Sequence, residues 1–233
     1  VAVGMIVVTL AVAGVLFDER AAPDREQAGS GYFRSVSPNS DVVVANGVVL
    51  PLPRLPNSDA DRRRLGARLF HDPLLSKDGT IACASCHDLA AGGDDGLPRS
   101  IGMNGAVGAV NAPSVLNAAL NVHQFWDGRA NSLEQQIDGP IHEPGEMGLG
   151  WPEAVRRVRA DGDYACDFLQ IYGAPPDEAS IKDAIATYER SLLTPGSPFD
   201  RYLLGDASAL PEDALAGWNL FQELGCVTCH QGI

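Results

Sequence analysis

Two copies of one pentapeptide pattern constrain this chain more than any other feature of its sequence. Cys-x-x-Cys-His occurs as CASCH at 83–87 and again as CVTCH at 226–230. The pattern is the attachment signature of c-type haem, in which both cysteine sulfurs bond to the porphyrin and the adjacent histidine ligates the iron. One copy alone could be a redox disulfide or half of a zinc site. Two copies, each ending in histidine, instead predict two covalently bound haem c groups.

The predicted cofactor-binding residues follow from this pattern. The first haem is expected on Cys83, Cys86 and His87, and the second on Cys226, Cys229 and His230, with the two histidines as ligands of the haem irons. Cys166 belongs to neither motif. A buried, unreactive thiol is the interpretation that we favour for it.

Composition limits the size of the domains and the kind of partner. With 233 residues, of which 45% are hydrophobic, the chain can form one large domain or two small ones. Its formal net charge of −13 argues against nucleic acid and anionic membrane surfaces as partners. The same charge is compatible with docking of a small basic electron carrier, although it serves solubility equally well.

The two ends of the chain carry separate expectations. Residues 1–20 begin VAVGMIVVTLAVAGVLF, which has the length of the apolar part of a secretory signal. We expect a signal peptide or a membrane anchor here, and cleavage or retention stays open. Because c-type haem is attached outside the bacterial cytoplasm, the expected location is the periplasm. Only three residues follow His230, so we expect the second haem domain to be incomplete in this chain.

Between these ends the pattern is mainly α-helical. Residues 21–57 are rich in Asp, Ser, Pro and Gly, and they predict a linker with a short strand at Val42–Val44. The Gly-, Asn- and Pro-rich run 92–113 is long and lacks periodicity, which predicts a functional loop. Helical spacing of apolar residues predicts helices over 114–121, 131–138, 152–160, 178–193 and 211–224.

One further helix is expected directly before the first haem motif. Ser58 is a candidate N-cap for a helix that ends near Pro73. Leu65, Leu69 and Phe70 would lie on one face of that helix and point into the core.

Longer motifs give a more specific indication of the family. In order, they are FHDPLLS, CASCH, GGDDGLPRSIG, NAPSVLNAA, FWDGRA, QIDGP, GEMG, LLTPGSPFDRYL and GCVTCHQG. In these motifs, from about Leu65 to the end, the chain resembles bacterial di-haem cytochrome c peroxidases and the related MauG-type proteins. The resemblance implies a mainly α fold with two cytochrome c-like domains. A peroxidatic haem domain would occupy 58–197, and the truncated start of an electron-transfer haem domain would occupy 198–233.

The resemblance also implies roles for residues outside the haem motifs. Trp126 matches a tryptophan that relays electrons between the two haems, although an ordinary core aromatic stays an open alternative. Glu146 and Gln136 match residues of the peroxide pocket. Heterolysis of peroxide requires a proton to move from the inner to the outer oxygen, and a positioned glutamate is suited to that transfer. Asn111 matches a ligand of a calcium ion that lies between the domains.

Met103 is the main departure from the family pattern. Many members carry a histidine here that caps the resting peroxidatic iron and is released on activation. A methionine thioether could also ligate iron, but a packing or solvent-facing side chain is equally consistent with the sequence Gly102–Gly105. We favour an open, five-coordinate peroxidatic haem that needs no release of a ligand.

The activity implied by the resemblance is reduction of hydrogen peroxide to water in the periplasm. Electrons would come from a small cytochrome c or a copper protein, and a homodimer is common in the family. Two alternatives stay open. One is MauG-like oxidation of a protein substrate, and the other is a di-haem cytochrome that only transfers electrons.

Overall fold

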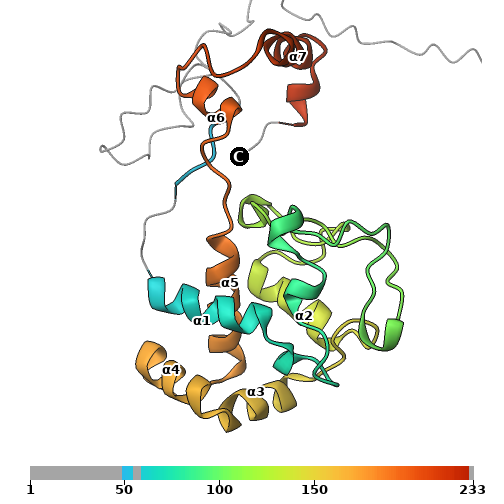
Figure 1. Ribbon diagram of the computed structural model, residues 1–233, viewed down its shortest axis with the longest axis vertical. Helices are drawn as coiled ribbons and strands as arrows, with labels where there is room; N and C mark the ends of the chain where they lie inside the picture. The colour runs from blue at the N-terminus through green and yellow to red at the C-terminus, as the bar shows by residue number, and fades with distance from the viewer. Residues whose placement is uncertain (1–48, 55–58, 231–233) are drawn as a thin grey trace, which may run out of the picture. The chain divides into compact units, whose positions relative to one another are not determined.

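The structure is a computed structural model, and it describes residues 49–54 and 59–230 of the chain. Within those ranges the chain forms α-helices and short 3₁₀ turns, with three isolated β-bridges and no strand (Figure 1). The helices are α1 (Ala60–His71), α2 (Leu133–His142), α3 (Trp151–Ala160), α4 (Gly162–Tyr172), α5 (Glu178–Arg190), α6 (Pro198–Leu203) and α7 (Glu212–Glu223). The mainly α prediction is therefore confirmed for the described part of the chain.

Several predicted features fall outside the described residues. These are the signal or anchor segment 1–20, most of the 21–57 linker, the strand at Val42–Val44 and the cap residue Ser58. Contacts divide the chain into Val1–Val42 and Val43–Ile233, and every described residue belongs to the second unit. None of the described helices is long and apolar enough to cross a membrane.

Helices α1 and α5 pack against each other at the centre of the core (Figure 1). Leu65, Leu69 and Phe70 of α1 are buried, as the helical spacing predicted. Gly66 permits the close approach, because a Cβ atom there would lie 1.9 Å from the carbonyl oxygen of Ala184 on α5. The N-cap of α1 is Asp59, and its side chain makes no capping hydrogen bond.

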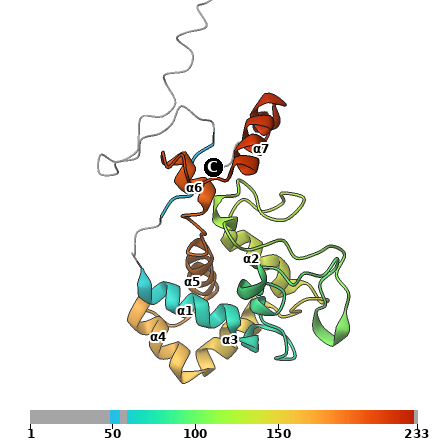
Figure 2. The ribbon, with the colours of Figure 1, turned by 45° about the horizontal axis from the view of Figure 1, so that its top comes forward.

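The predicted helix over 178–193 is confirmed as α5, which ends at Arg190. A capping box between Asp177 and Ser180 starts it, and Ile181 and Ile185 are buried on its inner face. α3 and α4 follow one another beside α1 in both views (Figures 1 and 2). α3 confirms the helix predicted over 152–160, with Pro152 in its first turn.

One local prediction is wrong, and two helices were not predicted. Residues 114–121 form only the 3₁₀ turn Ala118–Leu120, because Asn117 adopts a left-handed backbone (φ 62°) and its side chain binds Thr194. The helix α4 was not predicted, and only Tyr164 and Phe168 are buried on it. The short helix α6 was not predicted either.

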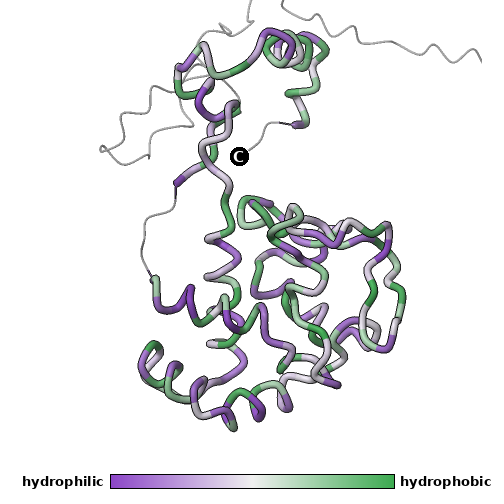
Figure 3. The backbone as a smooth tube through the Cα atoms, viewed as in Figure 1, coloured by the Kyte–Doolittle hydropathy of each residue, from purple (hydrophilic) through white to green (hydrophobic). Residues whose placement is uncertain are grey.

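The last described segment contains α6 and α7. Asp200 of α6 is buried and accepts hydrogen bonds from the backbone N–H groups of Leu52, Gly196 and Ser197. α7 confirms the helix predicted after Pro211. Apolar positions recur along α7 (Figure 3), yet none of its residues is buried by the described part of the chain.

Candidate functional site

Both Cys-x-x-Cys-His motifs fold into the same tight turn. In the first, the N–H groups of Cys86 and His87 donate to the carbonyl of Cys83 at 3.2 and 3.1 Å. In the second, Cys229 and His230 donate to the carbonyl of Cys226 at 3.2 and 3.0 Å. All five cysteines lie in described segments and none forms a disulfide. The turn gathers two free thiols and an imidazole, which is the donor set that a covalently attached haem requires.

The imidazole of His87 is prepared to ligate a metal through one nitrogen. Its Nδ1 lies 3.2 Å from the carbonyl oxygen of Gly93, so Nδ1–H donates and Nε2 is left as the acceptor. Burial lowers the pKa of His87, which favours the neutral ring that iron ligation needs. The role of Gly93 was not predicted from the sequence. Two features favour glycine at this position. The backbone has a φ of 82°, and a Cβ atom would lie only 2.9 Å from Oγ of Ser114.

The side chain of Cys83 in the first motif packs against the core. Burial raises the pKa of Cys83 to about 12, so the thiol is neutral at physiological pH. A zinc site would need thiolates and further ligands, and the described residues contain no cluster of three or more candidate metal ligands. The expectation of a buried Cys166 is wrong, because this residue is exposed on α4.

Two loops that are distant in sequence meet near the first motif. The N–H of Met103 donates to the carbonyl of Glu146 at 3.3 Å, and a Cβ atom on Gly102 would lie 1.9 Å from the carbonyl oxygen of Gly145. Met103 is 5% exposed, and its methyl group packs against Gly148. The solvent-facing alternative for Met103 is therefore excluded, and the packing alternative agrees with the structure.

The carboxyl of Glu146 is electrostatically coupled to the first motif. Glu146 is exposed as a residue, but partial burial of its carboxyl raises the pKa of that group, Glu143 raises it further and Arg129 opposes them. Burial also raises the pKa of the Cys86 thiol, and the charges of Asp95 and Glu146 add to that effect. A carboxyl with a raised pKa next to the haem attachment point can both hold and release a proton. Arg129, in the FWDGRA motif, was missed because its position depends on how the loop folds.

Gln136 is less closely connected to this pocket. It is half-buried on α2, one helix before the loop that carries Glu146. Its backbone N–H donates to Ser132, but in the described part of the chain no hydrogen bond joins its side chain to Glu146. His142, at the end of the same helix, is exposed and its Nδ1 contacts the carbonyl of Asp138 at 2.7 Å.

Trp126 and Asn111 are brought together by their loops. The indole N–H of Trp126 donates to the backbone carbonyl of Asn111 at 3.2 Å. Trp126 is 66% exposed, so it is not an ordinary core aromatic within the described residues. Asn111 is exposed as well, and within the described ranges its side-chain amide donates to the carbonyl of Ala112 at 3.4 Å. One amide group is not a calcium site on its own.

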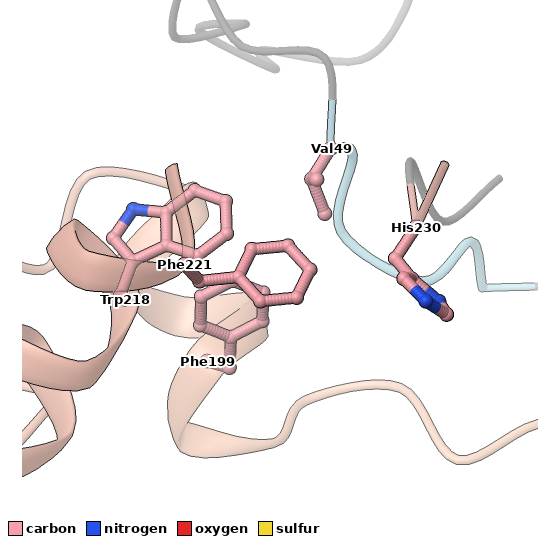
Figure 4. Close-up of a pocket in the computed structure, with 5 residues that line it drawn as sticks. All are labelled: Val49, Phe199, Trp218, Phe221 and His230. Atoms are coloured by element: carbon pink, nitrogen blue, oxygen red, sulfur yellow. The ribbon is translucent and has the colours of Figure 1, made fainter. Parts of the chain in front are cut away.

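The second motif borders an open apolar cavity of about 460 Å³ (Figure 4). Its lining consists of Val49, Phe199, Trp218, Phe221 and His230. The ring of His230 lies 6.3 Å from that of Phe221, and Phe199 packs edge-on against Trp218. Aromatic walls beside a histidine suit one face of a porphyrin, so the residues of both motifs fit haem c.

Comparison with known proteins agrees with this geometry. The family described as di-haem cytochrome c peroxidase matches residues 60–208. The chain belongs to this family. Membership in the di-haem cytochrome c peroxidase family implies haem c as the cofactor.

Similar proteins include both peroxidases and MauG proteins. The chain is 47% identical to cytochrome c peroxidase Ccp of Escherichia coli over 81% of this chain and 41% of the relative. It is 44% identical to cytochrome c551 peroxidase of Nitrosomonas europaea, over 83% of this chain and 58% of the relative. The crystal structure of a MauG-like protein associated with microbial copper homeostasis matches with a TM-score of 0.69 and 34% identity, over 78% of this chain and 56% of that one. The chain spans about half the length of these relatives.

Proposed function

We propose that the protein containing this chain reduces hydrogen peroxide to water at the haem held by Cys83, Cys86 and His87. The observation that carries this proposal is the carboxyl of Glu146, which has a raised pKa and lies within electrostatic reach of Cys86. The peroxidase names of the E. coli and N. europaea relatives support the same activity. A cytochrome that only transfers electrons would not need a proton-transferring carboxyl at this haem.

The chemistry divides between cofactor and protein. Haem held by Cys83, Cys86 and His87 would supply the iron that binds and reduces peroxide. Nδ1–H of His87 is held by the carbonyl of Gly93, which keeps Nε2 directed at the metal. Glu146 accepts the proton from the inner peroxide oxygen and returns it to the outer oxygen, which leaves as water. Arg129 opposes the rise in the pKa of Glu146 and so helps the carboxyl release its proton. Gln136, half-buried on α2, is assigned to the wall of the same pocket.

Electrons are proposed to enter through the second haem, on Cys226, Cys229 and His230. Trp126 then relays them toward the first haem. Its hydrogen bond to the carbonyl of Asn111 fixes the orientation of the indole. A calcium ion bound by the side chain of Asn111, with ligands from elsewhere in the full protein, would stiffen the same loop.

We assign Met103 to packing and not to iron ligation, which leaves the peroxidatic haem five-coordinate and ready for peroxide. Burial of its side chain against Gly148 supports this assignment. Replacing Met103 by Leu tests it, because the ferric absorption spectrum should not change. Loss of a low-spin signal in the Met103→Leu variant would show that the thioether is a ligand.

The location, electron donor and assembly of the enzyme are also part of this proposal. We place it in the periplasm, where c-type haem is attached, with residues 1–20 as a signal peptide or anchor. The net charge of −13 suits a small basic cytochrome c or a copper protein as electron donor. A homodimer is the expected assembly. MauG-like oxidation of a protein substrate is the second candidate, favoured by the 39% identical MauG of Methylorubrum extorquens.

A peroxide assay tests the main proposal. The haem-loaded full-length protein should oxidise a reduced cytochrome c donor when peroxide is added, at a rate well above that of free haem. Peroxide-dependent oxidation of a protein substrate with no oxidation of the donor would favour the MauG-like candidate. No reaction with peroxide at either haem would overturn both.

A further inference from the structure

We propose that Tyr188 is a reserve electron source for the first haem site and carries a tyrosyl radical when peroxide arrives with too little donor. This proposal rests on the proposed function, because peroxide must first react at the haem on His87. It adds a redox role to a residue outside the peroxide pocket and outside the route through Trp126.

A single buried ring joins Tyr188 to the iron-binding histidine. The ring centroid of Phe70 lies 6.4 Å from that of His87 and 5.3 Å from that of Tyr188. Phe70 is 0% exposed, so both contacts are made by a ring that lies in the close-packed interior. An electron released by Tyr188 therefore crosses two ring contacts to reach the proximal side of the haem site.

We assign the role of proton acceptor to His71, whose ring packs edge-on against that of Tyr188. The ring of His71 lies 6.0 Å from that of Tyr188. Nδ1 of His71 is 2.8 Å from the carbonyl oxygen of Ala67, so Nδ1–H donates and the lone pair of Nε2 can accept a proton. His71 is also exposed, which lets it exchange the proton with solvent.

The two other tyrosines of this helical core differ from Tyr188 in their surroundings and in their connection to the haem site. Their hydroxyl groups donate to carboxylates, that of Tyr164 to Asp72 and that of Tyr172 to Asp183, each at 2.8 Å. Tyr164 and Tyr172 each lie against an arginine guanidinium, at 4.5 Å from Arg68 and 5.1 Å from Arg62 respectively. A nearby cation disfavours removal of an electron from the ring, because the oxidised ring would place positive charge beside it. In the described part of the chain, neither ring makes an aromatic contact with Phe70 or His87.

The electrons and protons of this step balance. Reduction of peroxide to two water molecules consumes two electrons and two protons. When the donor supplies only one electron, the O–H bond of Tyr188 breaks: the electron passes by way of Phe70 to the haem site and the proton passes to Nε2 of His71. A neutral tyrosyl radical remains. The next electron from the donor, with the proton held on His71, restores the phenol.

Electron paramagnetic resonance of the haem-loaded full-length protein tests this proposal. The protein is mixed with hydrogen peroxide in the absence of donor and frozen within milliseconds to seconds. We expect a tyrosyl signal in the wild type, loss of that signal in Tyr188→Phe, and retention in the matched controls Tyr164→Phe and Tyr172→Phe. Phenylalanine keeps the ring at position 188, and an unchanged haem absorption spectrum before peroxide is added verifies that the variant is folded.

The outcomes separate this proposal from the proposed function. If the haem spectrum responds to peroxide but no tyrosyl signal appears, or the signal survives in Tyr188→Phe, the role of Tyr188 is overturned while the peroxidase stands. If the haem spectrum does not respond to peroxide at all, the proposed function itself fails. A His71→Gln variant with an undiminished radical yield would overturn the assignment of His71 as proton acceptor.

Discussion

The two haem motifs have the same local fold and opposite surroundings. Both turns direct two N–H groups at the carbonyl of the first cysteine, with lengths that agree within 0.1 Å (3.2 and 3.1 Å against 3.2 and 3.0 Å). His87, however, lies against the core and is held by Gly93, whereas His230 is exposed beside an open cavity. The pentapeptide therefore sets attachment and proximal ligation, and the surroundings set the chemistry.

The difference is largest in the groups that handle protons. Around the first motif lie Glu146 and the buried Glu189, and burial raises the pKa of both. The cavity beside the second motif is lined by apolar and aromatic side chains together with His230 (Figure 4). Electron transfer needs no proton donor, whereas cleavage of peroxide does. This difference supports the proposal that peroxide reacts at the first motif and that electrons enter at the second.

Replacing Glu146 by Gln should produce the largest effect. The amide keeps the shape of the side chain but cannot accept a proton, so peroxide turnover should fall by about 10²–10⁴-fold. Steady-state rates with a reduced donor measure the change. Glu143→Gln is the matched control, because this exposed neighbour is not assigned to proton transfer. Equal losses in both variants would contradict a specific role for Glu146.

Core packing gives the next largest contrast between the two regions. Phe70 beside the first motif is 0% exposed, and Phe70→Ala should reduce the free energy of unfolding by about 3–5 kcal/mol. Phe221 beside the second motif is partly exposed, and Phe221→Ala should cost no more than about 1 kcal/mol in the haem-free chain. Urea unfolding of the two variants measures both. Similar destabilisation would mean that α7 is packed as tightly as α1.

Glu189 should make stability depend on pH. It is 5% exposed, its Oε2 has no hydrogen-bond partner among the described residues, and burial, assisted by Glu134, raises its pKa from 4.5 to about 8. A raised pKa means that the folded state binds the proton more tightly than the unfolded state. The resulting stabilisation is complete below pH 4.5 and is lost as the pH rises to about 8.

Glu189→Gln should remove this dependence. Urea midpoints of the wild type should fall between pH 5 and pH 9 by the equivalent of a few kcal/mol, on the order set by such a pKa shift. The urea midpoint of Glu189→Gln should fall much less over the same pH range. Glu223→Gln on α7 replaces an exposed glutamate near the second motif and should follow the wild type. A parallel fall in all three proteins would place the titrating group elsewhere.

Periodic helices were predictable from sequence, and helices held by distant contacts were not. α1 and α5 bury apolar residues at helical spacing, which the pattern reveals directly. α4 buries only two side chains, so it shows little pattern. α6 has six residues and begins with a capping box between Ser197 and Asp200, and Asp200 also accepts a hydrogen bond from the backbone of Leu52, 148 positions away. No local rule could find that contact.

The candidate site divides in the same way. The attachment residues follow from spacing alone, because a pentapeptide fixes its own geometry. Glu146 was predicted as a pocket residue only through the longer motifs, because a single glutamate is most often a surface residue. Gly93 and Arg129 gain their importance from loop folding: one places a carbonyl at His87 and the other places a charge near Glu146. Sequence spacing carries no information on either.

Of the four predicted changes, Gly93→Ala should have the smallest effect. It tests the hydrogen bond from Nδ1 of His87 to the carbonyl of Gly93, which distinguishes His87 from His230. A methyl group at this position would lie 2.9 Å from Oγ of Ser114, on a backbone whose φ of 82° already disfavours it. The carbonyl should move away from Nδ1 of His87, and loss of this outer hydrogen bond should cost about 10–100-fold in peroxide turnover.

Gly92→Ala is the control, since its φ is 101° but a methyl group there meets no atom within 4 Å. A reduction potential of the first haem that changes in Gly93→Ala but not in Gly92→Ala would assign the effect to His87. If both variants match the wild type, then His87 is no better oriented than His230, and the contrast between the motifs must come from Glu146 and the packing of the core.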